Sequence, residues 1–298
     1  MRAVVVGSAN LDLVLGVDRL PGPGATVLAD PPRRHPGGKG ANQAVALARL
    51  GAETTLVARL GNDPEGASLR ESLAAAGVSV LPADPTEGQP SGLAFVCVDR
   101  TGESTVVVAP GANAHLQAAD IPDLEGVDVV VLSLEIPMPT VVATAAAARA
   151  ARALVVLNAA PAMLLPEGLL SLVSCLVVNA EEATLLSSVT GNAAEHALDL
   201  ASRGPERVVV TDGPAGCVVV PGPGMEAELV PAHIVTAVDA VGAGDCTTAA
   251  LAVALAEPMP LADAARFAMA AAAIAVSRPG AQTAMPTRAE VEALLIQP

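Results

Sequence analysis

The 298-residue chain has almost no aromatic side chains: two Phe, no Trp and no Tyr. Proteins that bind single-stranded nucleic acid usually stack bases on aromatic rings, and two phenylalanines cannot build such a platform. Basic residues are also scarce, with 16 Lys and Arg against 31 Asp and Glu and a net charge of −15. Because phosphate-backbone binding needs clustered positive charge, the composition argues against a nucleic-acid partner.

Long apolar runs are missing too, although 52% of the residues are hydrophobic. No uncharged run reaches the roughly 18 residues that a membrane-spanning helix needs, so we expect no membrane partner. The four cysteines have no Cys-x-x-Cys spacing, which favours buried free thiols over zinc or disulfides. The first residues read as an apolar strand without the features of a secretory signal, and we therefore expect a cytoplasmic protein.

What is present is an alternation of continuous β-branched runs with Ala- and Leu-rich segments. The expected strands are residues 2–6, 55–58, 127–133, 153–158, 175–179 and 207–211. The expected helices are residues 41–50, 66–76, 139–152, 195–203, 244–256 and a buried segment at 267–276. This alternation predicts an α/β fold, a doubly wound and mostly parallel sheet with helices on both faces. We expect one such domain over residues 1–298.

Two stretches break the alternation. Residues 13–36 are rich in Gly and Pro with a possible strand at 13–17, and residues 91–110 contain strand-like runs at 93–99 and 104–109. The second stretch has the pattern of a hairpin. We expect the two to form a small antiparallel sheet, a lid of about residues 11–37 and 90–112. It would cover the strand ends where open α/β sheets bind ligands.

The segment Asp239-Ala-Val-Gly-Ala-Gly-Asp-Cys-Thr-Thr248 follows a strand-like run at 234–238 and opens an apolar helix. Its glycines let the backbone approach a ligand, and a helix N-terminus offers free N–H groups to an anion. Asp245 could accept a hydroxyl proton while those amides hold charge on a transferring group. The alternative is an Asp N-cap after a glycine turn.

A second glycine cluster, His35-Pro-Gly-Gly-Lys-Gly-Ala-Asn-Gln-Ala44, opens the expected helix 41–50. It is not the phosphate loop of nucleotide hydrolases, because Gly40 stands where that loop needs Ser or Thr. Lys39, the chain's one lysine, and Asn42 suit a polyhydroxylated ligand. The alternative is a flexible loop with a capping Asn.

The segment Gly7-Ser-Ala-Asn-Leu-Asp12 directly follows the first expected strand. It lacks the glycines of the dinucleotide fingerprint, which disfavours a nicotinamide dehydrogenase. Asn10 and Asp12 are two apart and would share one face of a strand, where a carboxylate can accept hydrogen bonds from vicinal hydroxyls. The alternative is an Asx turn.

Three further positions carry polar groups near expected strand ends. Asn179 and Glu182 have capping-box spacing, or they supply oxygen ligands to a nucleotide-bound Mg²⁺. The turn Thr211-Asp-Gly-Pro-Ala-Gly216 wraps a nucleotide or closes a hairpin into residues 217–220. Glu135 is a sugar ligand or a solvated loop acid. Because all these clusters fall near strand ends, their joint pattern favours a single binding site.

These motifs, in this order, resemble those of the ribokinase-like (PfkB) carbohydrate kinases from end to end. Residues 37–44 are similar to the family's N-terminal signature, and residues 239–245 to its C-terminal one. Residues 7–12, 179–182, 211–216 and 270–282 follow the family's order as well. The long form Gly-Gly-Lys-Gly-Ala-Asn-Gln-Ala is most similar to that of the members that phosphorylate the 5-hydroxyl of D-ribose with MgATP.

The resemblance implies an ATP-dependent phosphotransferase acting on D-ribose. Asp245 would be the general base, and the N–H groups of Gly242, Ala243 and Gly244 would hold the transferring phosphoryl group. The implied sugar ligands are Asn10, Asp12, Gly38, Lys39, Asn42, Glu135 and Asp245. The implied MgATP contacts are Asn179, Glu182, Thr211, Asp212, Gly213, Gly216, Gly244 and Met269.

The resemblance also implies a monovalent cation, usually potassium, beside the anion site, and a homodimer formed through the lid. The implied cation ligands are Asp239 and the carbonyl groups of Val241, Ala275, Arg278 and Gly280, with Ala284 at a further position. The chain departs from the family at several points. Ala284 offers no hydroxyl oxygen to the cation, Met269 replaces a polar residue near the adenine, and Ala240, Cys246 and Ala159 replace Thr, Thr and Pro.

Two other functions stay open at this point. Another kinase of the same fold would act on deoxyribose, fructose or a nucleoside. A non-catalytic sugar or nucleotide sensor would keep the fold without transferring phosphate, although the Asp245 carboxyl beside Gly242-Ala-Gly244 argues against it.

Overall fold

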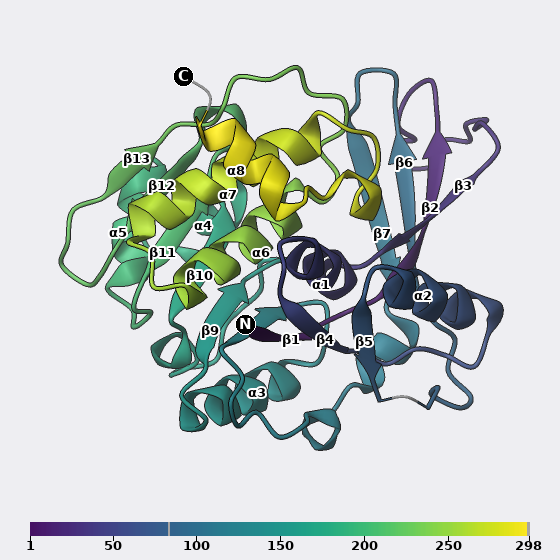
Figure 1. The fold of residues 1–298 in the computed structure, drawn as a ribbon. Helices are drawn as coiled ribbons and strands as arrows, with labels where there is room; N and C mark the ends of the chain where they lie inside the picture. Colours follow the sequence, from purple (N-terminus) through teal and green to yellow (C-terminus); the bar gives the residue numbers. More distant parts are fainter. Residues whose placement is uncertain (83, 297–298) are drawn as a thin grey trace.

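A nine-stranded sheet runs through the computed structural model, which describes residues 1–82 and 84–296 (Figure 1). Its spatial order is β13 (Glu228–Val230), β12 (Cys217–Val220), β11 (Val208–Thr211), β10 (Cys175–Asn179), β9 (Leu154–Asn158), β8 (Val129–Ser133), β1 (Arg2–Val6), β4 (Glu53–Val57) and β5 (Val78–Leu81). Neighbours from β11 to β5 pair in parallel, and β12 and β13 are antiparallel at one edge. The predicted mostly parallel α/β fold is confirmed.

Both faces of this sheet are covered by helices, because successive strand residues point to opposite faces. Val5 of β1 joins one buried hydrophobic cluster, and Val4 and Val6 join the other. The first cluster lies under α1 (Lys39–Arg49), α2 (Pro64–Ala75), α6 (Ala243–Ala256), α7 (Leu261–Val276) and α8 (Arg288–Ile296). The second lies under α3 (Met138–Ala150), α4 (Ala180–Leu186) and α5 (Ala193–Ala201).

Alanine takes the place of aromatic residues in the packing of these helices. In α6 and α7 the buried positions are mostly alanine, including Ala249, Ala250, Ala268 and Ala271. Small side chains allow two helices to approach closely, and many close contacts together supply the packing energy of the interior. The scarcity of aromatic residues is therefore compatible with a dense core around α6, the helix that carries Asp245.

A second sheet of four strands stands at the side of the main one (Figure 1). Its order is β3 (Arg33–Gly37), β2 (Asn10–Gly16), β6 (Gly92–Val98) and β7 (Ser104–Ala109). The β2–β3 and β6–β7 pairs are antiparallel, but β2 and β6 are parallel, so the expectation of a wholly antiparallel sheet is wrong. The reason is topological. Strands β1 and β5 run in the same direction in the main sheet, so the chain leaves both at the same end of that sheet and enters β2 and β6 from there.

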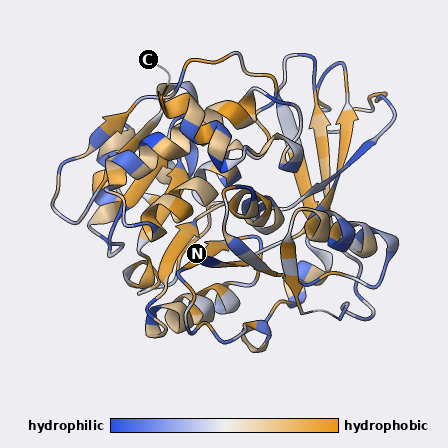
Figure 2. Cartoon of the chain, viewed as in Figure 1, coloured by the Kyte–Doolittle hydropathy of each residue, from blue (hydrophilic) through white to orange (hydrophobic). Residues whose placement is uncertain are grey.

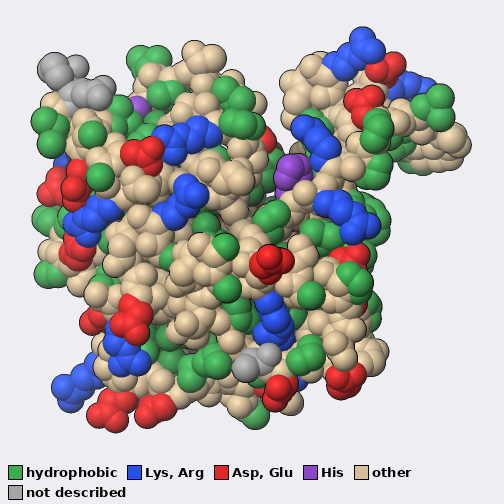
Figure 3. Space-filling model, turned by 45° about the vertical axis from the view of Figure 1, so that its right-hand side comes forward, with side chains coloured by type: hydrophobic (Ala, Val, Ile, Leu, Met, Phe, Trp, Pro, Cys, Tyr) green, Lys and Arg blue, Asp and Glu red, His purple; other side chains and the backbone are tan. Residues whose placement is uncertain are grey.

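The far end of the small sheet projects from the body of the molecule, with a hollow between the two (Figure 3). Strands β2 and β6 are largely hydrophobic, whereas β3 is hydrophilic (Figure 2). Residues of β6 and β7 on the surface of the sheet include Phe95, Val106, Val107 and Val108. Whether this sheet acts as a lid, and whether residues 1–298 form one domain with it, stay predictions.

One expected strand is absent from the structure. Residues 234–238 are irregular and largely exposed rather than extended in a sheet, and Ile234 is fully exposed. This β-branched run pairs with no strand, and its Val238 N–H donates instead to the Val276 carbonyl oxygen at the end of α7 (2.7 Å). Local propensity alone does not make a strand.

Two expectations from composition can be compared with the described residues. All four cysteines are free thiols, as predicted, but only Cys175, Cys217 and Cys246 are buried and Cys97 is partly exposed. Across residues 1–82 and 84–296, no helix is long and apolar enough to cross a membrane.

The chain changes direction across the sheet between β1 and β8. From β1 it proceeds outward to β4 and β5, and from β8 it proceeds the other way through β9, β10 and β11. The loops that leave two such neighbouring strands diverge and open a crevice at their carboxyl ends. A ligand site is therefore expected just beyond Val6 and Ser133.

Candidate active site

The N-terminus of α1 lies directly against the end of β1 at this crevice. The Ala41 N–H donates to the Ser8 carbonyl oxygen (2.9 Å). A Cβ atom on Gly40 would lie 2.7 Å from the Cα of Gly7, which is too close for any side chain. The glycines of the two N-terminal motifs therefore bring helix and strand into backbone contact. The flexible-loop alternative for Lys39 is wrong, because Lys39 is the first residue of α1.

The N-terminus of α6 faces the same crevice. Gly242 is its N-cap and has a left-handed backbone (φ 78°), which favours glycine. The Ala243 N–H donates to the Ala240 carbonyl oxygen (3.2 Å). Of the three residues whose amides are expected to bind phosphate, Ala243 therefore has its N–H already paired, whereas Gly242 and Gly244 line the pocket. Asp245 is the third residue of the helix, so the N-cap alternative for Asp245 is wrong.

The Asp245 carboxylate is buried and held by two amides of α1. Asn42 Nδ2 donates to its Oδ2 (2.9 Å), and Gln43 Nε2 donates to its Oδ1 (3.0 Å). Burial raises the pKa of Asp245 to about 6; Lys39 and the two amides act in the opposite direction, and Glu135 adds to the rise. A carboxyl group with a pKa close to neutrality is suited to accept a proton from a hydroxyl.

Amide side chains that the sequence analysis did not assign complete this arrangement. Gln43 Nε2 also donates to Asn158 Oδ1 (3.2 Å), and Asn158 Nδ2 donates to the Val177 carbonyl oxygen (3.2 Å). Gln282 Nε2 donates to Asn42 Oδ1 (3.2 Å). Gln43 carried one usable sequence signal: it is four residues after Lys39 and therefore on the same face of a helix.

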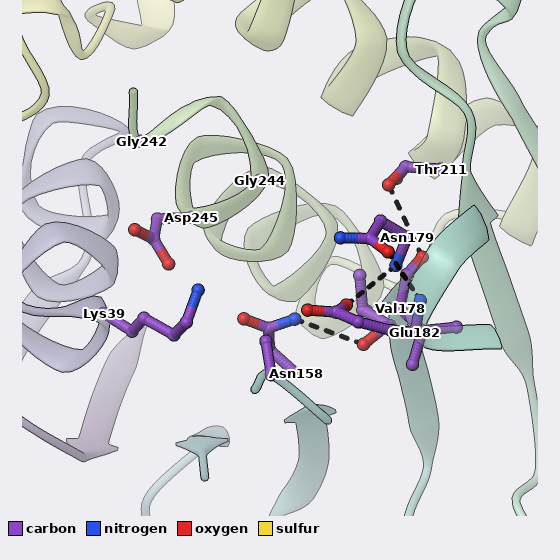
Figure 4. A pocket seen from close by; sticks show the side chains of 11 residues that line it. Lys39, Asn158, Val178, Asn179, Glu182, Thr211, Gly242, Gly244 and Asp245 are labelled. Atoms are coloured by element: carbon purple, nitrogen blue, oxygen red, sulfur yellow. Dashed lines mark hydrogen bonds between the residues drawn. The ribbon is translucent and has the colours of Figure 1, made fainter. Parts of the chain in front are cut away.

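Lys39 extends from α1 into the pocket toward Asp245 and Asn158 (Figure 4). Burial acts to lower its pKa, but the surrounding carboxylates of Asp245, Glu135 and Glu182 outweigh it, and the pKa is raised. The one lysine of the chain is thus an ammonium group among acids, a position in which it stays charged.

Asn10, Asp12 and Glu135, which the resemblance assigns to the sugar, are outside the lining of this pocket, although Asp12 and Glu135 are close enough to Asp245 to interact with its charge. Asn113, an unassigned residue of the short helix Gly111–His115, donates from Nδ2 to Asn10 Oδ1 (2.8 Å) and fixes that amide. Glu135 Oε2 accepts from the Ser8 hydroxyl and from the Lys39 N–H (3.3 Å), so it is not merely a solvated acid. Gly38 is the N-cap of α1.

The Asp12 carboxyl on β2 is coupled to the other acids of this group. Burial, followed by repulsion from Glu135 and Asp245, raises its pKa to about 7. Asp12, Glu135 and Asp245 therefore repel one another in the ligand-free protein, and hydroxyl donors between them would relieve the repulsion.

On the opposite side of the pocket lie Asn179, Glu182 and Thr211 (Figure 4). The predicted capping box exists: Glu182 N–H donates to Asn179 Oδ1 (2.7 Å), and Asn179 N–H donates to Glu182 Oε2 (2.9 Å). This leaves Glu182 Oε1 for another partner. Burial raises the pKa of Glu182, and the nearby Glu181 adds to the rise. The hydrogen bond from the Asn179 N–H and the charge of Lys39 act in the opposite direction but do not cancel it.

Other residues expected near the nucleotide do not line this pocket. The predicted hairpin joins β11 and β12, and Asp212, Gly213 and Gly216 lie in its turn. Met269 is buried in the hydrophobic cluster under α6 and α7. The structure therefore brings Thr211 to the pocket and leaves these four residues outside its lining.

Asp239 joins the two segments expected to bind a cation. Its Oδ1 accepts from the Val241 N–H (3.0 Å) and its Oδ2 from the Gly280 N–H (2.9 Å). The Ala275 carbonyl accepts from the Arg278 N–H (3.1 Å) at the end of α7. Ala284 lies in the short helix Gln282–Ala284 and is buried.

Comparisons with known proteins agree with this geometry. The family model for pfkB family carbohydrate kinases matches residues 2–288. The chain is 38% identical over 295 residues to the ribokinase of Bacillus subtilis (strain 168), with 98% of each chain covered.

Solved structures show the same likeness. The crystal structure of ribokinase from Thermotoga maritima has a TM-score of 0.88 and 35% identity, with all of both chains covered. The structure of Arabidopsis thaliana ribokinase complexed with ribose and ATP has a TM-score of 0.86 and 30% identity, covering 100% of this chain and 99% of that one. The chain therefore belongs to the pfkB family of carbohydrate kinases.

Proposed function

We propose that this protein is an ATP-dependent ribokinase, which transfers the γ-phosphoryl group of MgATP to the 5-hydroxyl of D-ribose and releases D-ribose 5-phosphate. One observation carries the proposal beyond the family. The Asp245 carboxylate lies buried at the third residue of α6, beside the Gly242 and Gly244 amides and among polar groups suited to a sugar. The similarity to ribokinases over nearly the whole chain supports the same acceptor.

The reaction follows from the positions of these groups. Asp245 accepts the proton of the 5-hydroxyl as that oxygen attacks the γ-phosphorus and the bond to the β–γ bridging oxygen breaks, with ADP leaving. The amides of Gly242 and Gly244 stabilise the negative charge on the transferring group. Asn10, Asp12 and Asn42 hold the other hydroxyls, and Lys39 balances the acids around them. Tight positioning of this kind supplies much of the acceleration in phosphoryl transfer.

The residues of the pocket fit a nucleotide-bound Mg²⁺. Magnesium prefers carboxylate and water oxygens, and Glu182 presents its free Oε1 beside Asn179 on the nucleotide side. We propose that Glu182 and Asn179 hold the metal, in part through water. When bound, Mg²⁺ would neutralise part of the charge on the β- and γ-phosphates.

The segment around Asp239 has the donor chemistry for a monovalent cation. The Asp239 carboxylate accepts from Val241 and Gly280 and so ties the two expected segments together, and backbone carbonyl oxygens are ligands that suit K⁺. We propose that Asp239 and the carbonyl groups of Val241, Ala275, Arg278 and Gly280 hold it. Ala284 contributes only its backbone carbonyl there. Within the described residues no cluster of three His, Cys, Asp or Glu side chains offers another metal site.

The small sheet supports the proposal on assembly, and the cysteines support the proposal on location. Edge strand β7 is exposed along its whole length and shows Val106, Val107 and Val108 at the surface. An exposed apolar edge strand is an association site, so we propose a homodimer through this sheet, which would also serve as the lid. The free cysteines fit the reducing cytoplasm in which we place the protein.

A panel of acceptors tests the proposed substrate. D-ribose, 2-deoxyribose, fructose and a nucleoside are compared by kcat/KM with MgATP as donor. We expect D-ribose to exceed the others by at least about tenfold, the effect of one lost hydrogen bond to a buried polar group. A higher value for another acceptor would reassign the substrate but not the kinase chemistry.

A further inference from the structure

Gln43 is fully buried, lies outside the lining of the pocket and contacts the carboxylate on which the chemistry depends. Its two amide hydrogens point to two different acceptors, Asp245 Oδ1 (3.0 Å) and Asn158 Oδ1 (3.2 Å). The side chain therefore spans from α1 to α6 and β9.

The orientation of this amide is imposed from both sides. Asn158 presents its oxygen to Gln43 because its own Nδ2 donates to the Val177 carbonyl oxygen. The reversed amide would place Gln43 Oε1 against that oxygen and against the Asp245 carboxylate. In the orientation observed, Oε1 is buried and meets no hydrogen-bond donor among the described residues. A buried oxygen without a donor is costly, and such groups in native proteins call for an explanation.

The explanation we propose rests on the proposed function: Gln43 is a positioning residue that holds Asp245 in its ionised form and directs its free lone pairs toward the acceptor hydroxyl. An ionised carboxylate only accepts hydrogen bonds, whereas a protonated one would lose an acceptor position. A donor fixed on Asp245 Oδ1 therefore favours the base form, in opposition to the burial that favours the proton.

Other charged groups also face Asp245, and the test has to separate them from Gln43. Lys39 faces it from α1, Glu135 from the segment after β8, and Asp12 from β2. All three stay unchanged when only Gln43 is replaced. A difference between variants therefore reports on the amide alone.

Gln43→Met is the central variant, because methionine has a similar length and no N–H group. The expected result is an acid limb of the kcat profile that moves upward by about one pH unit, as for loss of a hydrogen bond to a charged group. At pH 6 this lowers kcat about fivefold more than at pH 9, while the KM for D-ribose stays within about threefold. Thr144→Val, which removes a buried hydroxyl from α3, is the matched control and should leave the profile unmoved.

A readout without turnover separates this proposal from the proposed function. In protein labelled with ¹³C at the Asp carboxyl carbon, the Asp245 resonance is identified by its loss in Asp245→Asn. We expect it to titrate near pH 6 in the unchanged protein and about one unit higher in Gln43→Met. If Gln43→Met does not fold, Gln43→Leu removes the same N–H donor without adding a charge, and the same upward shift of the Asp245 titration is expected.

The outcomes are distinct. An Asp245 resonance that titrates at the same pH with and without the Gln43 amide would overturn the proposal, whatever the acceptor proves to be. So would a kcat that falls by one factor at every pH, which is the signature of a merely structural role. Failure of the unchanged protein to phosphorylate D-ribose would instead count against the proposed function, and the titration would still decide the role of Gln43.

Discussion

The two sides of the pocket are built in different ways. Among the residues proposed to bind the sugar, Asn10, Asn42 and Asp245 are 2%, 5% and 6% exposed, and their side chains are fixed by partners distant in sequence. On the nucleotide side Asn179 and Glu182 are more exposed and bond mainly to each other, three residues apart. The proposed sugar site is thus held by contacts within the protein itself, whereas the proposed nucleotide site consists of a helix cap and a turn that form from local contacts.

Because of this difference, we expect substitutions on the two sides to have different effects on catalysis and on binding. A preformed, desolvated site strengthens every electrostatic contact within it, and a small displacement there affects the chemical step. An exposed site made of local caps leaves the chemistry intact when one donor is lost and weakens nucleotide binding instead. The three changes below test that division, from the largest expected effect to the smallest.

Asp245→Asn should produce the largest loss. Removing the base on the sugar side is expected to lower kcat by about 10²- to 10⁴-fold, the usual contribution of general base catalysis. Sugar binding should persist, because an asparagine oxygen still accepts the amide of Gln43. The measurement is steady-state kcat together with the Kd of D-ribose by calorimetry. Near-normal turnover in this variant would remove Asp245 from the mechanism.

Glu182→Gln should affect only the nucleotide side. We expect the KM for MgATP to rise about tenfold, the cost of one lost charged interaction with the bound metal, with the KM for D-ribose unchanged. Glu195→Gln is the matched control, since Asn192 and Glu195 form the same capping box at the start of α5. If both variants raise the KM for MgATP equally, the effect is a property of caps and the assignment of Glu182 fails.

Asp12→Asn should have the smallest effect, on stability. Because the folded protein holds the Asp12 proton with a pKa of about 7, against an ordinary aspartate value of 3.8, stability falls as the pH rises between these values. The variant removes that loss, so its free energy of unfolding should exceed that of the unchanged protein by about 1 kcal/mol at pH 8 and by much less near pH 4.

Urea unfolding at the two pH values measures this, with Glu53→Gln at the exposed start of β4 as the control. An equal gain at both pH values would mean that ionisation of the buried Asp12 carboxyl is not its cause. The same variant should bind D-ribose more weakly, since the carboxylate accepts its hydroxyls.

The sequence predicted the structure correctly where it depends on residues that are close together in the chain. The mostly parallel sheet follows from buried strands alternating with helices, and the capping box of Asn179 and Glu182 depends on residues three apart. The signatures around Lys39 and Asp245 placed both residues at helix N-termini and predicted the family, which is confirmed.

Sequence patterns failed where partners come from distant parts of the chain. Asn42 bonds to residues 203 and 240 positions away, and Asn113 reaches Asn10 across 103 positions. No spacing rule connects such positions. The run at 234–238 has strand propensity but pairs with no strand, and the parallel pairing of β2 with β6 depends on where two distant strands end.

Single-turnover phosphoryl transfer tests the central claim most directly. Enzyme in excess over γ-labelled MgATP is mixed with D-ribose, and the label is followed into product for the unchanged protein and for Asp245→Asn. The account predicts that the unchanged protein transfers the label to D-ribose 5-phosphate within one turnover and that the variant binds both substrates but transfers at least about 10²-fold more slowly. Binding of both substrates by the unchanged protein without transfer of label would contradict the account and identify a sensor.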